Sequence, residues 1–234
     1  DYGVVQDTGE RGMRGTVYGV GVGPGDPELM TIKARNAIIS ADVIACPEKN
    51  GKPGIAFVIA EKAVPEISSK ELLLISLPME KESRTKEDAH RAAAKEIESL
   101  LEKGKTVAFL TLGDPSMYST ASYVFSEITK DRYHIEMISG IPSFCAASSK
   151  LLISLASGNA PVLITTAENA DFSFPGSLVI MKTGSHLLTI KNKLSESGRK
   201  AYLVENCGLP NERVYEGIDS FPEECGYFST AIVL

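Results

Sequence analysis

Apolar residues along this chain form short continuous runs that alternate with longer stretches of helical spacing. The first run, TVYGVGV at 16–22, predicts a strand, and ELMTIKARNAIISA at 28–41 carries apolar residues at roughly helical intervals. A glycine-rich turn joins them, with Asp26 and Pro27 available as helix cap and first-turn residue. The pattern therefore predicts strand, turn and helix in that order.

The same succession recurs as far as residue 139. Further strands are predicted at 42–46, 71–76, 105–112 and 133–139, with helices at 55–64 and 85–105 and another after the turn that begins at 113. The run at 105–112 is almost entirely apolar, which is typical of a strand buried on both faces of a parallel sheet. This alternation predicts a parallel α/β domain over residues 13–139.

The later part of the chain has a different pattern. One strong helix is predicted at 186–198, among five strand candidates: PVLITT, SLVIMKT, AYLVENC, ERVYEG and YFSTAIVL. This strand-rich pattern predicts a second, mixed-sheet α/β domain over residues 140–234, with the boundary near Ser139 to Pro142. Residues 1–12 show no apolar periodicity, and we interpret them as a tail or an expression remnant.

Composition and charge exclude several classes of protein. The chain is 43% apolar, as expected of a globular protein, and its net charge of −6 opposes a general nucleic-acid binder, which needs a clustered basic surface. No apolar run approaches the length of a membrane span and no secretory leader is visible, so we expect no membrane association and a cytoplasmic protein. The four cysteines, Cys46, Cys145, Cys207 and Cys225, are widely spaced and histidines are few. We therefore expect free thiols, with neither a disulfide framework nor a bound metal.

The glycine-rich turn after the first strand matches neither familiar phosphate loop. A dinucleotide fingerprint needs a third glycine where Pro24 or Asp26 stands, and a Walker loop needs Gly-Lys-Ser/Thr where Gly25 is followed by Asp-Pro. Two interpretations stay open. Gly23 and Gly25 permit close approach to a ligand, with amide groups of the following helix meeting an anion, or they serve only the torsions of a tight turn.

Two later turns favour a ligand site. LGDPSMYST at 112–120 repeats the Gly-Asp-Pro triplet after another apolar strand, and SGIPSFCAA at 139–147 follows the next strand. Ligands gather at the carboxyl ends of parallel strands, so three such turns suggest a cleft. The charged segment at 78–88 is a solvated loop or, alternatively, a mobile loop that closes over a ligand with Lys81, Arg84 and Lys86.

Five segments carry a resemblance to a known family. GVGPGDPELMT, LTLGDPSMYST, SGIPSFCAA, VIMK and VENC, in this order, resemble the tetrapyrrole (corrin/porphyrin) methyltransferases, which use S-adenosylmethionine. The likeness extends from Met13 to the end of the chain. GDPSMYST, SGIPSF and the terminal YFSTAIVL look most like the precorrin-2 or cobalt-factor II C-20 methyltransferases of cobalamin synthesis. The resemblance implies the class III fold of two αβα domains with the active site in the cleft between them, and a homodimer.

The resemblance also implies which residues bind the cofactor. They are Pro24, Leu112, Gly113, Asp114, Met117, Pro142, Ser143, Met181 and Cys207. Cys207 stands where the family usually has glycine, and Pro142 stands where it usually has Thr or Ser, so these contacts would involve the backbone. The alternatives are a plain helix cap for Asp114 and ordinary core packing for Met117 and Met181.

Methylation at C-20 requires no covalent nucleophile, because the sulfonium methyl is activated and the bridge carbon is electron-rich. A base for the bridge proton could be Asp26, Asp114 or Glu205, and the sequence does not choose among them. The tetrapyrrole substrate carries eight carboxylates, so its binding is expected to involve backbone donors of the turn at Gly23, Gly25 and Asp26. Basic side chains expected to assist are those of Arg35, Arg84, Lys86 and Arg91.

Three alternatives remain at this stage. Another family member acting at C-2/C-7 would keep the cofactor residues and change the substrate site. A nicotinamide-dependent oxidoreductase would use Glu48 as its ribose acid, and a non-catalytic α/β module would bind a ligand without turnover. Cobalt, if present, would arrive inside the macrocycle.

Overall fold

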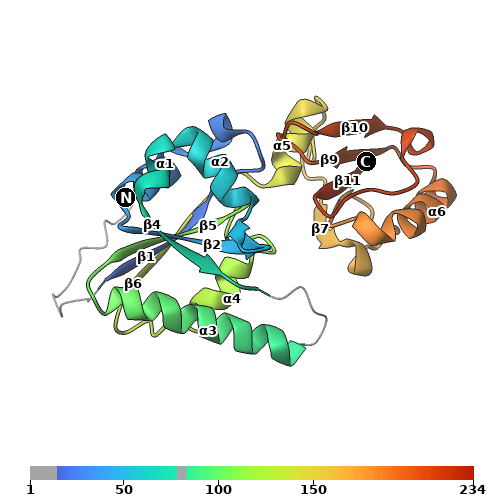
Figure 1. Ribbon diagram of the computed structural model, residues 1–234. Helices are drawn as coiled ribbons and strands as arrows, with labels where there is room; N and C mark the ends of the chain where they lie inside the picture. Colours follow the sequence, from blue (N-terminus) through green and yellow to red (C-terminus); the bar gives the residue numbers. More distant parts are fainter. Residues whose placement is uncertain (1–14, 78–82) are drawn as a thin grey trace. The chain divides into compact units, whose positions relative to one another are not determined.

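The computed structural model describes residues 15–77 and 83–234 of the chain (Figure 1). Contacts between Cα atoms divide these residues into two compact units. Unit 1 contains 15–21 and the described part of Ile32–Ser139, and unit 2 contains Val22–Thr31 and Gly140–Leu234. The chain thus passes from one unit to the other after residues 21, 31 and 139. The tail interpreted at 1–12 and the loop residue Lys81 lie outside the described residues.

Unit 1 is built on a six-stranded sheet in the order β3-β2-β5-β1-β6, with β4 also paired to β2. Its strands are β1 (Thr16–Gly21), β2 (Val43–Lys49), β3 (Lys52–Pro53), β4 (Glu71–Ile75), β5 (Thr106–Thr111) and β6 (His134–Ile138). All pairs are parallel except the β2–β3 hairpin. Residues Val107 to Leu110 of β5 have no exposed surface, which confirms a strand buried on both faces.

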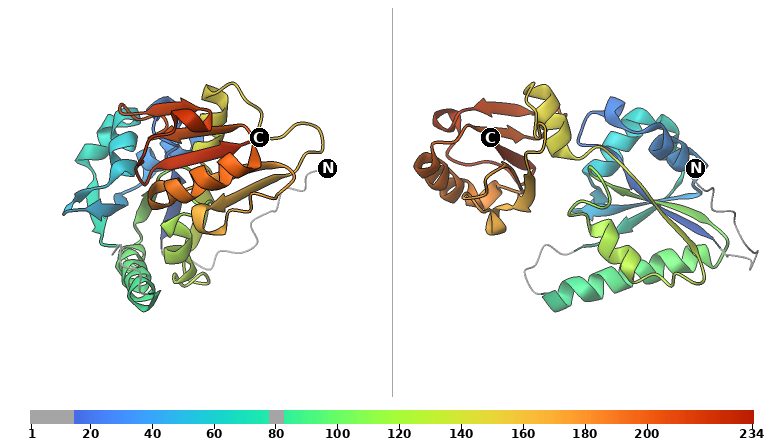
Figure 2. Two further views of the ribbon diagram at one scale, coloured as in Figure 1. Left: turned by 90° about the vertical axis from the view of Figure 1, so that its right-hand side faces the viewer. Right: turned by 180° about the vertical axis from the view of Figure 1, so that it is seen from behind.

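Helices cover both faces of this sheet, α1 and α2 on one side and α3 and α4 on the other (Figures 1 and 2). They are α1 (Ile32–Ser40), α2 (Ile55–Ala63), α3 (Ser83–Leu101) and α4 (Thr120–Ser126), with a 3-10 turn at Pro65–Ser69. The apolar stripe of α3, which includes Ala93, Ile97 and Leu101, packs into a core with Phe109 of β5 and Val124 of α4. The helical spacing of α3 therefore predicted its buried face.

The helix expected at 28–41 begins later than predicted. Residues Pro27–Leu29 form a 3-10 turn, and α1 starts only at Ile32. The buried face of α1 consists of Ala34, Ala37 and Ile38, whereas Ile32 is 79% exposed.

Unit 2 is built on a five-stranded sheet in the order β10-β9-β11-β8-β7. Its strands are β7 (Val162–Thr166), β8 (Ser177–Met181), β9 (Ala201–Glu205), β10 (Arg213–Glu216) and β11 (Ser229–Val233). Strands β7 and β8 are parallel, and β11 runs antiparallel to both β8 and β9. All five strands fall within the predicted runs, and the last of them in sequence is the middle strand of the sheet.

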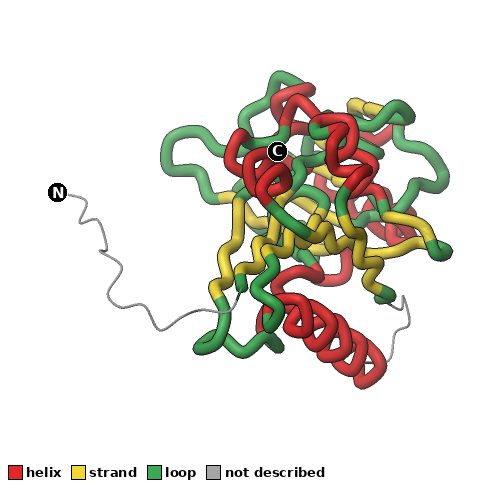
Figure 3. Tube along the Cα trace, turned by 60° about the vertical axis from the view of Figure 1, so that its left-hand side comes forward, coloured by secondary structure: helices red, strands yellow, loops and turns green. Residues whose placement is uncertain are grey.

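Two helices pack against opposite faces of the unit 2 sheet. Helix α6 (Leu187–Ser197) shares a core with Leu203 and Ala231, and α5 (Ser143–Lys150) shares a core with Val204 and Ile232. Neighbouring residues of one strand point to opposite faces, so the two cores lie on either side of the sheet. Short 3-10 turns occur at Ala167–Asn169, Gly184–His186 and Ile218–Ser220. Figure 3 shows the helical and extended segments along the chain.

Both units are therefore αβα sandwiches. Among the described helices, none combines the length and the apolar character that a membrane span requires.

Candidate functional site

The carboxyl ends of three strands meet at one edge of the unit 2 sheet. Because β11 is antiparallel to β8 and β9, these two strands run in the same direction, and β7 is parallel to β8. Their last residues are Thr166, Met181 and Glu205. The start of β11 lies at the same edge, with Ser229 opposite Glu205 and Thr230 opposite Met181.

Thr230 connects this edge to α5. Its Oγ1 lies 3.3 Å from the Oγ of Ser143, the first residue of α5. The carbonyl of Pro142 accepts the N–H groups of Cys145 and Ala146, so Pro142 begins the helix through its backbone. The structure thus brings together Ser143 and Met181, two predicted cofactor residues, around Thr230. No role was predicted for Thr230, which directly precedes the apolar run AIVL.

The turn after β9 packs against the glycine-rich turn. A Cβ placed on Gly208 would lie 2.5 Å from the backbone nitrogen of Asp26, and a Cβ on Gly25 would collide with the carbonyl oxygen of Cys207. Gly208 has φ = +77°, a left-handed conformation that also favours glycine. The close approach that Gly25 permits is thus to the protein's own backbone.

The backbone N–H groups of the turn at 26–30 donate hydrogen bonds to acceptors within the same turn. The Asp26 carboxylate accepts from Glu28 N–H at 2.9 Å, Asp26 O accepts from Leu29 N–H, and Pro27 O accepts from Met30 N–H. The helix predicted from Glu28 does not begin there, and the N–H groups of Glu28, Leu29 and Met30 donate within the turn itself. Asp26 does cap the 3-10 turn, as predicted for its position before Pro27.

A charged clamp holds the turn after β9. The Glu212 carboxylate accepts from Gly208 N–H at 2.6 Å and forms an ion pair with Lys150 at the end of α5. The same turn includes Cys207, whose thiol pKa burial raises to about 11. At neutral pH this thiol is protonated, which makes it a poor nucleophile.

The Glu205 carboxylate is engaged in hydrogen bonds within the protein. Glu205 is buried, and its carboxylate accepts from Gly226 N–H at 2.8 Å and from the Tyr215 hydroxyl at 3.2 Å. These bonds fix the segment before β11 against the end of β9.

In unit 1, the second Gly-Asp-Pro turn follows β5 directly, next to the end of β1, where Gly21 pairs with Thr111. Leu112 is half-buried, and Gly113 has φ = +70°. The buried Asp114 accepts from the N–H of Ser116 at 2.8 Å and from its hydroxyl, so it closes a local turn.

Asp114 is not the cap of the following helix. Ser119 caps α4 by accepting from Ala121 N–H at 3.1 Å, and its hydroxyl shares a hydrogen bond with Thr111. The plain-cap alternative for Asp114 is therefore wrong. Met117 is half-buried on the same turn, and its N–H donates to the carbonyl of Asp114.

The predicted basic residues of unit 1 do not form one patch. Arg35 is exposed on α1 and Lys86 is exposed on α3, helices on opposite faces of the sheet (Figure 1). Arg91 lies near Asp88 and Glu127, at 3.4 Å from each. The side chain of Arg84 lies outside the described part of the structure.

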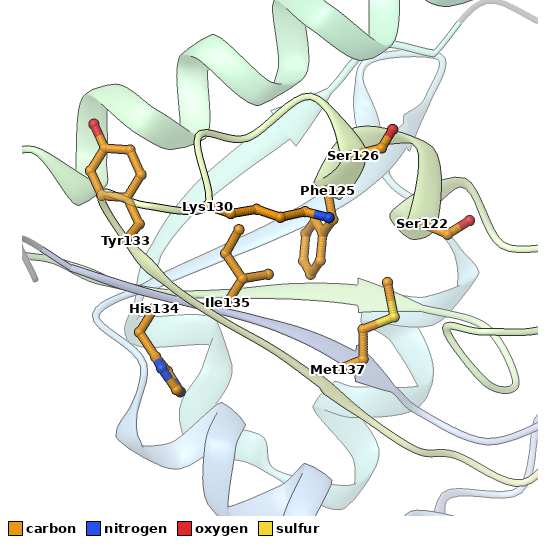
Figure 4. Close-up of a pocket in the computed structure, with 8 residues that line it drawn as sticks. All are labelled: Ser122, Phe125, Ser126, Lys130, Tyr133, His134, Ile135 and Met137. Atoms are coloured by element: carbon orange, nitrogen blue, oxygen red, sulfur yellow. The ribbon is translucent and has the colours of Figure 1, made fainter. Parts of the chain in front are cut away.

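A surface groove of about 530 Å³ lies elsewhere on unit 1, next to α4 and β6 (Figure 4). Its lining residues are Ser122, Phe125, Ser126, Lys130, Tyr133, His134, Ile135 and Met137. The His134 ring points away from Phe125, on the other side of β6. None of the predicted site residues lines this groove.

The profile of the family described as "Tetrapyrrole (Corrin/Porphyrin) Methylases" matches residues 16–218. The chain belongs to this family. The chain is 34% identical to the "Probable cobalt-precorrin-2 C(20)-methyltransferase" of Methanocaldococcus jannaschii, over 93% of this chain and 95% of that protein. It is 30% identical to the "Precorrin-2 C(20)-methyltransferase" of Sinorhizobium sp, over 94% and 95%.

The chain spans about half the length of some curated relatives that it matches. It is 31% identical to the "Cobalamin biosynthesis protein CobIJ" of Mycobacterium tuberculosis (strain ATCC 25618 / H37Rv), over 94% of this chain but 46% of that protein. The similar region thus makes up less than half of that protein.

Solved structures confirm the class III methyltransferase fold. Cobalt precorrin-4 methyltransferase CbiF has a TM-score of 0.71 at 17% identity, covering 97% of this chain and 98% of its own. Uroporphyrin-III-C-methyltransferase from Thermus thermophilus has a TM-score of 0.68 at 24% identity, covering 94% and 92%. Another structure of the Thermus thermophilus enzyme, with a TM-score of 0.67 at 20% identity and covering 94% and 97%, is a complex with S-adenyl homocysteine.

The described residues contain no group of three or more His, Cys, Asp or Glu side chains placed to hold a metal ion.

Proposed function

We propose that this methylase transfers the methyl group of S-adenosylmethionine to C-20 of precorrin-2 or cobalt-factor II in cobalamin biosynthesis. The observation that carries the proposal is its identity of 30–34% to two proteins named C(20)-methyltransferases, along nearly the whole length of both partners. The terminal YFSTAIVL, which forms β11 and the segment before it, agrees with that subfamily.

S-adenosylmethionine supplies an activated sulfonium methyl, so the chain's task is to bind and orient. Holding two reactants in near-attack geometry can contribute ~7–11 kcal/mol without a covalent intermediate. The protonated Cys207 thiol agrees with a reaction that needs no nucleophile.

The cofactor residues remain part of this proposal, and they fall into two groups that can be tested separately. One group, in unit 2, is Pro24, Pro142, Ser143, Met181 and Cys207. The other, in unit 1, is Leu112, Gly113, Asp114 and Met117. Ser143→Ala would remove the hydroxyl shared with Thr230, and Asp114→Asn would remove one negative charge, each read out as S-adenosylmethionine affinity by calorimetry.

The base for the bridge proton stays open among Asp26, Asp114 and Glu205. Each carboxylate accepts hydrogen bonds that fix a turn or a loop. Substrate contacts from Gly23, Gly25, Asp26, Arg35, Arg84 and Lys86 belong to the same proposal. The proposal also includes a homodimer, which light scattering would test. It further includes a cytoplasmic location and cobalt that is carried only by the substrate.

The deciding experiment is an anaerobic incubation of the purified protein with methyl-labelled S-adenosylmethionine and either metal-free precorrin-2 or cobalt-factor II. Mass spectrometry and NMR would then locate any added methyl. One methyl at C-20 is the expected result, and the preferred substrate shows whether cobalt enters before this step. A methyl at C-2 or C-7 would replace the proposal with the alternative family member. Cofactor binding without transfer to either substrate would overturn the C-20 assignment.

A further inference from the structure

Two large aromatic side chains stand exposed directly before β11. Tyr227 is 53% exposed and Phe228 is 43% exposed, and their rings meet edge to face with centroids 5.3 Å apart. Aromatic rings contribute most when buried, so an exposed pair is a candidate contact surface. The two residues are the first of the YFSTAIVL motif. None of the predicted cofactor residues belongs to this motif.

The backbone that carries this pair is held firmly at the carboxyl edge of the unit 2 sheet. Gly226 N–H donates to the Glu205 carboxylate at 2.8 Å, and Asn206 N–H donates to the Phe228 carbonyl at 2.8 Å. The buried Ser229 hydroxyl donates to the Gly226 carbonyl at 2.6 Å. The rings are therefore exposed on a fixed backbone, beside the ends of β8 and β9.

A lysine adds positive charge at the same place. Lys182 follows Met181 at the end of β8, and its Nζ lies 5.7 Å from the centroid of the Tyr227 ring. Its backbone has φ = +58°, which is strained for a residue with a Cβ, and such strain tends to concentrate at functional sites. Lysine pairs with carboxylates as a flexible point charge.

Aromatic faces next to a cation suit a broad, largely apolar ring with carboxylates at its rim. We infer that Tyr227, Phe228 and Lys182 form a substrate surface for the tetrapyrrole, with the two rings against the macrocycle and Lys182 near a peripheral carboxylate. This inference rests on the proposed function and adds residues that the resemblance did not assign.

Four variants test the surface. Tyr227→Leu and the double variant Tyr227→Leu/Phe228→Leu remove rings, Lys182→Gln removes the charge, and Lys182→Arg keeps it. The matched control is Tyr123→Leu, which removes a ring that is 58% exposed on α4 and stacked on His90 in unit 1. Circular dichroism and thermal melting confirm folding, and the single Tyr227→Leu serves if the double variant does not fold.

The binding probe is uroporphyrin III, a stable macrocycle with eight carboxylates, followed by fluorescence quenching. We expect the double variant to bind it about tenfold more weakly, as the loss of aromatic contacts predicts. Lys182→Gln should weaken binding about threefold and reduce its dependence on salt, whereas Lys182→Arg and Tyr123→Leu should bind like the wild type. S-adenosylmethionine affinity should stay within about twofold in all variants, and KM for precorrin-2 should rise in the ring variants.

Unchanged probe affinity and unchanged KM in the ring variants would overturn the inference. So would a loss of S-adenosylmethionine affinity with normal probe binding, which would assign the rings to the cofactor. Failure of the proposed function has a different signature: a wild-type protein that binds uroporphyrin III through these residues but does not methylate precorrin-2.

Discussion

Gly208 and Gly217 have the same backbone torsion, φ = +77°, and differ only in what surrounds them. A Cβ on Gly217 would have no neighbour within 4 Å, whereas a Cβ on Gly208 would lie 2.5 Å from the Asp26 nitrogen. The two glycines therefore separate the cost of a left-handed backbone from the cost of a blocked space.

We expect Gly217→Ala to lower the free energy of unfolding by about 1–2 kcal/mol, the cost of left-handed backbone for a residue with a Cβ. Gly208→Ala should cost about 1–3 kcal/mol more, because the methyl group would force the two turns apart. Urea denaturation of both variants measures the difference. Equal losses would show that the turn at Asp26 does not pack against Gly208.

The sequence analysis found most of the candidate site residues only through resemblance, and single residues show why. The Gly25 motif allowed either a ligand or a tight turn, and the structure adds a close approach to the backbone of Cys207, about 180 residues away in the chain. Nothing local to Gly25 could have indicated that contact.

At the scale of elements, ion pairs connect helices and strands that are far apart in sequence. Lys33 of α1 pairs with Glu136 of β6, and this hydrogen-bonded ion pair holds the pKa of the Glu136 carboxyl below its ordinary value. A carboxyl with a lowered pKa in the folded state stabilises that state above the pKa of the unfolded chain.

The stabilisation by Glu136 should therefore be present at pH 7 and be lost as the pH falls below 4.5 and through the lowered folded-state pKa. We expect Glu136→Gln to be less stable than the wild type at pH 7, and the difference to shrink toward pH 3. Because the pair is partly exposed, the difference should also decrease in 1 M salt. Urea denaturation at pH 7, 5 and 3 provides the measurement. A difference that stays constant with pH would contradict the role of this charge.

The predicted elements agree with the structure because their apolar periodicity was strong. The predicted start of the first helix was wrong, because local hydrogen bonds form a 3-10 turn at Pro27–Leu29, capped by Asp26. The helix α1 therefore begins only at Ile32. The short strand β3 was missed, although Asn50 and Gly51, both with positive φ, are a typical two-residue hairpin turn.

At the scale of the whole molecule, the contacts of residues 22–31 do not follow their place in the chain. This segment groups with unit 2, although residues on both sides of it belong to unit 1. The predicted domains, 13–139 and 140–234, divide the chain at a single point and stay a prediction. Contacts between segments so far apart cannot be inferred from local periodicity.

A fragment of residues 140–234 would lack the segment that packs against Gly208. We expect it to be less stable than the same region in the whole chain, by about 1–3 kcal/mol, the usual range for losing a defined set of contacts. Hydrogen exchange at residues 206–209 should be faster in the fragment and should slow when a peptide of residues 20–32 is added. Identical exchange in the fragment and the whole chain would show that the segment contributes nothing to unit 2.

The position of β11 has a consequence for biosynthesis. Residues Ser229–Val233 form the middle strand of the unit 2 sheet, between β9 and β8. A ribosome makes β8 and β9 first, and each must wait with one unpaired edge until the strand between them has been translated. Unpaired edges invite association with other chains, so a message truncated before the codon for Ser229 would yield a nascent chain that depends on chaperones.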